Sequence, residues 1–336
     1  MATFKKLKVT NVTADFRKAT SIFELPIPTP GSNQILVKNY FSGVNAADLN
    51  VTAARYFTVG KVPFDIGFES IGVVEAVGEE VTGFKVGQAV MSCTGDGYSE
   101  YLLKEAKELF PIPTVDPKYI SLMVCGLSAA IGLDYAGKIK AGDKVLITAA
   151  AGGTGHIAVQ WAKSKGAYVI GTTSSAKKAT FLKGIGADHV INYKEEDLSA
   201  ILKRDYPDGV NVIWETIGGK AAESLIPHLA KFGRMVLIGG ITGYKTEGFP
   251  KIEIQPSIIL MNEITLTGFF LLNHDDKFPV YLNELIRGVE SGKLNITNDF
   301  GESTPDGIFS GLDGAVRGVE HLHSGKSIGK VTVKLC

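Results

Sequence analysis

The sequence predicts an α/β protein with two domains, an all-β barrel-like domain and a doubly wound parallel sheet. First, 336 residues is about the length of two domains. Second, residues 4–113 contain short alternating apolar runs separated by Pro and Gly, a pattern typical of short strands joined by turns. Third, from about residue 117 onward, longer β-branched runs alternate with helix-length amphipathic stretches, which indicates a parallel sheet covered by helices.

Short strands are predicted for the β-rich domain, and glycines such as Gly83 and Gly87 mark its turns. The clearest of these strands span residues 35–40, 70–77 and 88–92. The second domain contains six apolar runs, at residues 144–149, 168–172, 189–193, 210–214, 233–238 and 264–268. Six buried strands with intervening helices make a doubly wound sheet.

The first domain is expected to be discontinuous. After a helix around residues 277–291, a final strand at residues 329–334 is expected to return to the β-rich domain. The second domain is then inserted into the first. The predicted boundaries are residues 1–120 for the first domain, 121–268 for the second, and 269–336 for the return.

Charge and cysteine content narrow the function classes. Lys and Arg together number 35, as do Asp and Glu, so the net charge favours neither nucleic acid nor an anionic membrane as a partner. Cys93, Cys125 and Cys336 lie far apart, which indicates neither a disulfide framework nor a zinc lobe. No apolar run reaches the roughly 18 residues of a membrane span, and no secretory signal is visible. We therefore expect a cytoplasmic protein.

A glycine-rich turn follows the first strand of the second domain and precedes an apolar helix. Such a turn lets backbone N–H groups meet a pyrophosphate where the helix N-terminus carries partial positive charge. With five further strands behind it, the turn predicts a dinucleotide site. The residues expected to form it are Ala151, Gly152, Gly153, Thr154 and Gly155.

The end of the next strand predicts which dinucleotide binds. NAD enzymes place an acid there to bind the ribose 2′-hydroxyl. Residues 172–178 contain no acid, and instead offer hydroxyls such as Ser174 and lysines such as Lys178, which suit a 2′-phosphate. NADPH is therefore the expected cofactor. The alternative is that Ser174 only caps the next helix while the lysines are solvated.

Residues 149–155, with Ser174 and Lys178, resemble the quinone-reductase branch of the medium-chain dehydrogenases/reductases, over nearly the whole chain. Further strings, at residues 43–48, 63–69, 268–270 and 303–307, narrow the resemblance to one group of reductases. It implies a GroES-like catalytic domain and a Rossmann domain.

The implied activity is NADPH-dependent reduction of the double bond of α,β-unsaturated ketones such as 15-keto-prostaglandins. Quinone reduction and a non-catalytic, crystallin-like NADPH-binding role are the alternatives. The resemblance also implies a small-molecule substrate and a homodimer paired through an edge strand near residues 264–269. It leaves a peroxisomal location as an alternative to the cytoplasm.

Metal ligands are missing from the sequence. Zinc alcohol dehydrogenases carry Gly-His-Glu where this chain has Gly67-Phe68-Glu69, and phenylalanine cannot bind zinc. The only close histidine pair, His321 and His323, is expected in a surface turn. We therefore expect a reaction that needs no metal, such as hydride addition to an enone or a quinone.

Tyr56 and Asn45 are the candidate catalytic residues by resemblance, as hydrogen-bond donors near the substrate carbonyl. Two alternatives stay open: Tyr56 only packs against the substrate, and Asn45 only holds a loop through its side chain. The resemblance adds further cofactor-lining residues, of which Tyr193 could instead be core packing. Besides the glycine turn, Ser174 and Lys178, they are Tyr193, Thr216, Ile238, Tyr244, Phe269, Phe270, Leu271 and Ser327.

Overall fold

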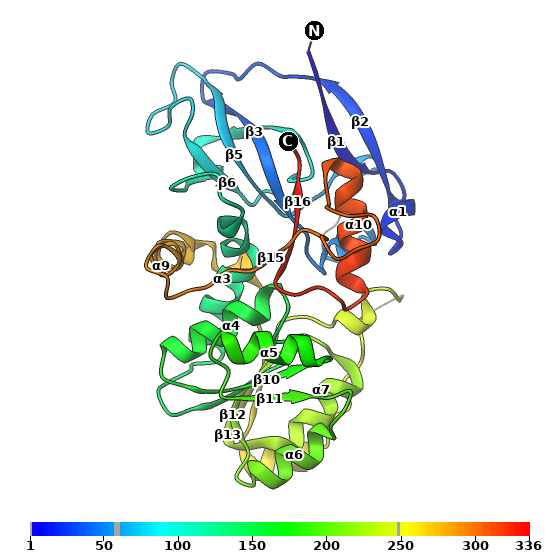
Figure 1. Ribbon diagram of the computed structural model, residues 1–336, viewed down its shortest axis with the longest axis vertical. Coiled ribbons are helices and arrows are strands. Elements are labelled where there is room, and N and C mark those ends of the chain that lie inside the picture. Colours follow the sequence, from blue (N-terminus) through cyan, green and yellow to red (C-terminus); the bar gives the residue numbers. More distant parts are fainter. Residues whose placement is uncertain (1, 57–60, 247–248) are drawn as a thin grey trace. The chain divides into compact units, whose positions relative to one another are not determined.

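The computed structural model describes residues 2–56, 61–246 and 249–336 (Figure 1). Its internal contacts divide the chain into two units. The first unit comprises Met1–Val124 and Thr297–Cys336, and the second comprises Cys125–Ile296. The first unit is therefore discontinuous in sequence.

The first unit is built on two sheets. One has the strand order β2-β1-β4, and the other has the order β15-β16-β3-β5-β6-β8, with β7 also paired to β3. The last long strand, β16, pairs antiparallel with β3, so the chain does return to the β-rich unit. The strands are β1 (Thr3–Val9), β2 (Thr20–Pro26), β3 (Gln34–Gly43), β4 (Phe64–Asp65), β5 (Glu69–Val77), β6 (Ala89–Ser92), β7 (Tyr101–Glu105), β8 (Leu109–Pro111), β15 (Asn298–Asp299) and β16 (Lys330–Lys334).

The helices that join these strands are short. They are α1 (Phe16–Ala19), α2 (Asp48–Thr52), η1 (Ala106–Glu108) and η2 (Pro117–Leu122). The longer α10 (Gly311–His323) precedes β16 and packs against it. Alternating apolar residues of four strands, Ile35, Val37, Val74, Val90 and Leu102, form one core of this unit.

The second unit contains a six-stranded parallel sheet with the order β11-β10-β9-β12-β13-β14. Counted along the chain, this order is 3-2-1-4-5-6, so the doubly wound sheet predicted from the sequence is confirmed. The strands are β9 (Lys144–Ile147), β10 (Tyr168–Thr173), β11 (His189–Asn192), β12 (Val210–Glu215), β13 (Leu229–Leu237) and β14 (Thr265–Gly268).

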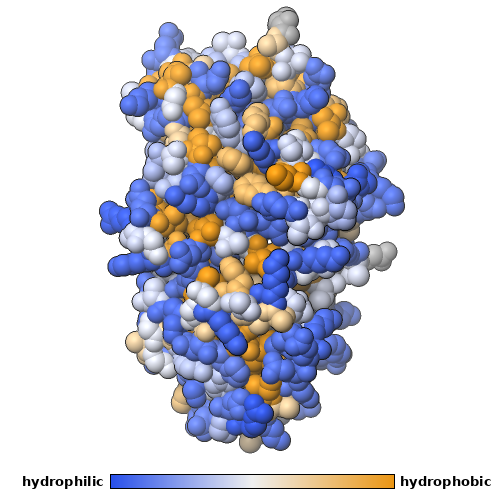
Figure 2. Space-filling view, viewed as in Figure 1, coloured by the Kyte–Doolittle hydropathy of each residue, from blue (hydrophilic) through white to orange (hydrophobic). Residues whose placement is uncertain are grey.

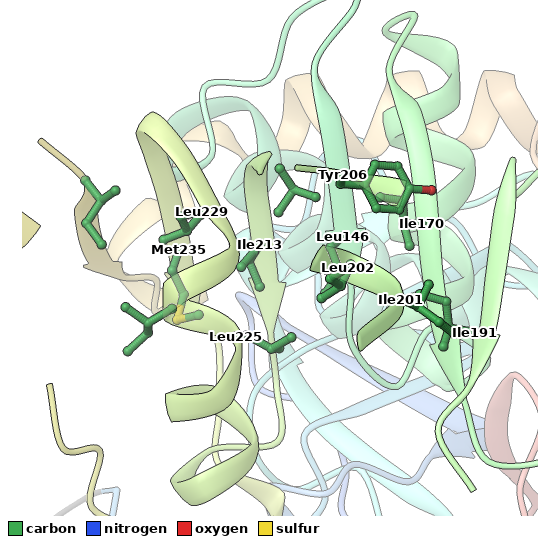
Figure 3. Close-up of a cluster of buried hydrophobic side chains, with 13 residues drawn as sticks. Leu146, Ile170, Ile191, Ile201, Leu202, Tyr206, Ile213, Leu225, Leu229 and Met235 are labelled. Carbon is green, nitrogen blue, oxygen red and sulfur yellow. The ribbon is translucent and has the colours of Figure 1, made fainter. Parts of the chain in front are cut away.

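Helices cover both faces of this sheet, with α4 and α5 on one face and α6 on the other (Figure 1). On the α6 face, Leu146, Ile170 and Ile213 from three neighbouring strands pack with Ile201 and Leu202 (Figure 3). The helices of the unit are α3 (Val124–Ile131, its first residue still in the first unit), η3 (Gly132–Ala136), α4 (Gly153–Ser164), α5 (Ala176–Gly184), α6 (Leu198–Asp205), α7 (Gly219–Leu225), η4 (Ile226–His228), η5 (Ile241–Gly243), α8 (Pro256–Asn262), η6 (Leu271–Lys277) and α9 (Phe278–Glu290).

The chain returns to the first unit later than the sequence suggested. Residues 269–296, expected in the first domain, belong to the second unit. The reason is the packing of α9: the Tyr281 hydroxyl donates to Asp134 (3.0 Å), and its ring lies 5.9 Å from that of Trp161. After α9, the N–H of Asn295 donates to Gln160 of α4 (2.7 Å).

Among the described residues, no helix is long and apolar enough to cross a membrane. The face in Figure 2 carries many hydrophilic residues, with hydrophobic ones interspersed among them.

Candidate active site

The glycine turn joins β9 to α4. The helix begins at Gly153, and its first N–H groups have no partner within the helix. A Cβ on Gly155 would lie 2.5 Å from the carbonyl oxygen of Ala149, so glycine is required where the helix passes the strand end. The turn thus presents N–H groups and partial positive charge together, which is an arrangement that binds phosphates.

Two buried polar atoms at the ends of the adjacent strands β10 and β11 have no partner among the described residues. Thr173 and Asn192 are the last residues of β10 and β11 and are neighbours in register. Within the described chain, Thr173 Oγ1 and Asn192 Nδ2 are buried and have no hydrogen-bond partner. A buried polar group left unpaired costs about 1–3 kcal/mol. The two atoms therefore mark a candidate position for a polar ligand.

The face of the sheet on which Thr173 lies is the face of the glycine turn. Side chains alternate along a strand, so Thr173 shares a face with Gly171. A Cβ on Gly171 would lie 3.2 Å from Cβ of Ala150, in the turn, and 3.3 Å from Leu182 of α5. The unpaired hydroxyl thus faces the side where the turn and α5 lie.

Ser175, rather than Ser174, caps α5. The Ser175 hydroxyl accepts a hydrogen bond from the N–H of Lys178 (3.3 Å). The alternative in which Ser174 is the cap is therefore wrong, because Ser174 lies one residue before the capping position. The side chain of Ser174 is partly buried and takes no part in the capping hydrogen bond.

The other expected cofactor residues of the second unit follow the carboxyl ends of parallel strands, which share one sheet edge. The N–H of Ile238 donates to Glu215 O (2.9 Å), and the N–H of Phe269 donates to Leu237 O (3.0 Å), so neighbouring strand ends are joined there. The hydroxyls of Thr148 and Thr216 lie 3.2 Å apart at the same edge.

Three aromatic residues expected at the cofactor differ in exposure. Tyr193 is 47% exposed, so it is not core packing. Tyr244 is buried, and its hydroxyl accepts from the N–H of Gly240 (3.1 Å). Phe270 is 41% exposed, whereas its neighbour Leu271 is buried. Their roles at a cofactor stay predictions.

Asn45 lies in the first unit and is held by a buried ion pair. Its Nδ2 donates to Glu69 Oε1 (3.0 Å) and to Gly43 O (3.2 Å), and its Oδ1 accepts from Lys330 Nζ (2.6 Å). Lys330 Nζ also lies 2.5 Å from Glu69 Oε1. Both amide hydrogens of Asn45 are thus used within the protein.

Asp48 lies next to this pair and is fully buried. Its Oδ2 accepts from the Tyr98 hydroxyl (2.7 Å) and from the N–H of Asn45 (2.9 Å), whereas Oδ1 is unpaired within the described residues. Burial raises the pKa of Asp48 to about 7, against the opposing effect of these bonds. Burial also raises the pKa of the Cys93 thiol to about 12, so this thiol is no thiolate nucleophile at neutral pH.

Tyr56 and Ser327 are the remaining candidates of the first unit. Tyr56 is partly buried and follows α2, and the described chain ends there before resuming at residue 61. Ser327 is buried and lies three residues before the start of β16. Sequence reasoning did not identify Asp48, Lys330, Thr173 or Asn192, because buried polar residues give no local pattern that separates them from turn residues.

No group of three or more His, Cys, Asp or Glu side chains among the described residues could hold a metal ion. His321 and His323 do not lie in a surface turn as expected: they end α10, and His321 is buried. Its Nε2 lies 3.0 Å from Asp299 Oδ2, and its ring packs 5.4 Å from that of Phe309.

Comparison with known proteins identifies the family. Residues 31–114 match the alcohol dehydrogenase GroES-like domain, and residues 153–287 match the zinc-binding dehydrogenase family. Mouse (Mus musculus) prostaglandin reductase-3 is 40% identical over 338 residues, which cover 99% of this chain and 90% of the relative. A probable quinone oxidoreductase of Leishmania amazonensis is 40% identical over 341 residues, covering 99% and 98%.

A solved structure has a similar fold. The quinone oxidoreductase of Escherichia coli, complexed with NADPH, is 26% identical, covers 98% of this chain and 99% of its own, and superposes with a TM-score of 0.84. The sequence strings that narrowed the resemblance pointed to prostaglandin reductase 3, also called zinc-binding alcohol dehydrogenase domain-containing protein 2, and that resemblance is confirmed. The chain belongs to the medium-chain dehydrogenase/reductase superfamily of oxidoreductases, with quinone-oxidoreductase-like proteins as its neighbours.

Proposed function

We propose that this protein is an NADPH-dependent reductase of the double bond of α,β-unsaturated ketones, with 15-keto-prostaglandins as candidate substrates. The observation that carries the proposal is the end of β10, where the sequence from Thr172 to Lys178 contains no acid. The name of the mouse relative supports the substrate class, and the Escherichia coli structure supports the cofactor.

The residues present fit NADPH. The glycine turn provides N–H groups for the pyrophosphate, and its shape depends on Gly155, where a Cβ would clash with the backbone of Ala149 and Ala150. Ser174, Lys178 and Tyr193 would hold the 2′-phosphate, which no carboxylate in the turn after β10 repels. The unpaired atoms of Thr173 and Asn192 supply further hydrogen-bonding capacity at this end of the site.

Bound NADPH would supply a hydride to the β-carbon of the substrate. The chain's own residues would stabilise the negative charge that develops on the carbonyl oxygen, and a proton from water at the α-carbon would complete the saturated ketone. Because both amide hydrogens of Asn45 are donated within the protein, we assign the donor role to Tyr56 and a structural role to Asn45. Conjugated carbonyl compounds suit a site without a metal, because the developing charge is delocalised.

The test is a mass-spectrometric screen of enones incubated with the protein and NADPH, in which each saturated product is counted against NADPH consumed. We expect one saturated product per NADPH. Quinone reduction is the second candidate, favoured by the Leishmania relative, and its one-electron form would consume oxygen without saturating an enone. Cofactor binding without turnover of either class would leave the non-catalytic role.

We also propose that catalysis needs no zinc, since Phe68 replaces the histidine ligand. Elemental analysis of the purified protein should find less than stoichiometric zinc, and chelators should leave turnover unchanged. One tightly held zinc per chain would contradict this.

A homodimer paired through β14 is the proposed assembly. Among the described strands, β14 lies at the edge of its sheet and pairs only with β13. The neighbouring α8 exposes Leu260 and Met261, at 78% and 75%. Sedimentation should give twice the chain mass. Gly268→Pro should give a monomer, because the N–H of Gly268 points away from β13 and proline removes this edge donor. A monomeric wild type would refute the dimer.

A further inference from the structure

The ion pair of Glu69 and Lys330 is almost completely buried, and a contribution to the free energy of unfolding does not account for this burial. The two residues are 0% and 1% exposed. Removing such charges from water costs several kcal/mol per ion, and apolar replacements of buried pairs are often neutral or stabilising. A role other than stability is therefore the better account of this pair.

Both partners reach out to other segments. Glu69, the first residue of β5, accepts from Lys330 at the start of β16 (2.5 Å) and from Asn45 before α2 (3.0 Å). Its second oxygen accepts from the N–H of Val124, the first residue of α3 (2.8 Å). One carboxylate thus fixes the starting points of three segments.

The backbone is shaped around this pair. A Cβ on Gly43 would lie 2.5 Å from Glu69 Oε1 and 2.8 Å from Lys330 Cε. No side chain can be accommodated there unless the pair moves. Together with Asn45, the two charged groups therefore form a closed three-membered network in which each member contacts the other two.

Two of the candidate site residues lie close in sequence to members of this network. Asn45 leads into α2, which ends four residues before Tyr56. Lys330 follows Ser327 by three residues. We propose that the Glu69–Lys330 pair positions the segments of Tyr56 and Ser327 for the reaction. Its relevance to turnover rests on the proposed function, whereas its effect on the two segments does not.

The decisive variant removes both charges at once. Glu69→Gln with Lys330→Met leaves no lone buried charge, so the free energy of unfolding should stay near that of the wild type, whereas either single variant should be less stable. Hydrogen exchange in residues 45–56 and 324–329 should nevertheless be about tenfold faster in the double variant, because local opening becomes easier. Exchange in the second unit should not change.

Turnover gives the second readout. In the double variant, kcat/KM for an enone should fall about tenfold, since misplaced substrate-binding groups lose orientation. Affinity for 2′,5′-ADP, a probe of the site proposed in the second unit, should stay unchanged. Glu215→Gln is the matched control, because it neutralises a fully buried carboxylate of the second unit. It should leave exchange in both segments unaltered.

Asn45→Ala keeps the ion pair and provides a test should the double variant not fold. It should speed exchange in residues 45–56 and leave residues 324–329 protected. The positioning role would be overturned if residues 45–56 of Asn45→Ala exchanged at the wild-type rate. It would also be overturned if both segments of a stable double variant did so. If the wild-type protein showed no turnover, the proposed function would be refuted. The positioning role would still be tested, because hydrogen exchange measures it without turnover.

Discussion

Two clusters of buried polar side chains, one in each unit, differ in whether their atoms are paired. In the first unit, the side chains of Glu69, Lys330 and Asn45 satisfy one another. In the second unit, Thr173 and Asn192 end adjacent strands with buried atoms that are unpaired within the described chain. Because Asn39, Asn50 and Ser70 of the first unit also have an unpaired buried atom, the missing partner alone does not mark a ligand site. What distinguishes Thr173 and Asn192 is their place at adjacent strand ends, and each unpaired atom there costs free energy until a ligand binds.

Asp48 is one of several first-unit residues with a buried polar atom that is unpaired within the described chain, and it gives the largest expected effect. Its folded pKa of about 7 lies about 3 pH units above that of an unfolded aspartate. The folded state therefore binds this proton more tightly, and its contribution is complete below about pH 4 and lost as the pH rises through 7. The loss amounts to at most about 4 kcal/mol.

Asp48→Asn should remove this dependence. Denaturant unfolding of the wild type and the variant at pH 5 and pH 8 measures it, and the difference between the two proteins isolates Asp48 from its neighbours Glu69, Lys330 and Tyr98. We expect the variant to gain stability relative to the wild type as the pH rises. An equal pH dependence in both proteins would show that Asp48 is ionised throughout.

Lys178→Ala tests the ligand side of the comparison. If Lys178 binds the 2′-phosphate as proposed, its loss should cost about 1.5–3 kcal/mol of NADPH affinity, or about tenfold to a hundredfold. NADH has no phosphate at this position, so its affinity should barely change. Calorimetric titration of both cofactors decides, and equal losses would mean that Lys178 supports the fold.

Tyr56→Phe should slow enone reduction about tenfold, because one ordinary hydrogen bond to the developing charge is removed. NADPH affinity should stay as in the wild type, since the hydroxyl acts on the substrate. Steady-state kinetics over several enones measures the effect. Unchanged turnover numbers would leave Tyr56 as a packing residue.

The sequence predicted the sheet of the second unit because β-branched runs and glycine turns are local patterns. It did not predict the partner of Glu69 or Asn45, because Lys330 is 285 residues from Asn45 and no local pattern links them. The histidine pair was misplaced because His323 lies close to Gly325, whereas the apolar spacing of Leu312, Val316 and Val319 extends α10 to His323. Packing between residues distant in the sequence therefore determines the features that the sequence did not predict.

Thr173→Val is expected to have two effects of opposite sign, one on the stability of the protein without cofactor and one on its affinity for NADPH. Valine keeps the shape of threonine and removes the unpaired hydroxyl, so the protein without cofactor should become about 1 kcal/mol more stable. If the hydroxyl bonds to NADPH, affinity should fall about fivefold for the same reason. Denaturant unfolding without cofactor and titration with NADPH measure the two effects. Ser164→Ala, which removes a hydroxyl already bonded to Trp161 O, is the control and should not gain stability. A Thr173→Val variant that gains stability and keeps full NADPH affinity would show that this hydroxyl is a cost of the fold and serves no ligand.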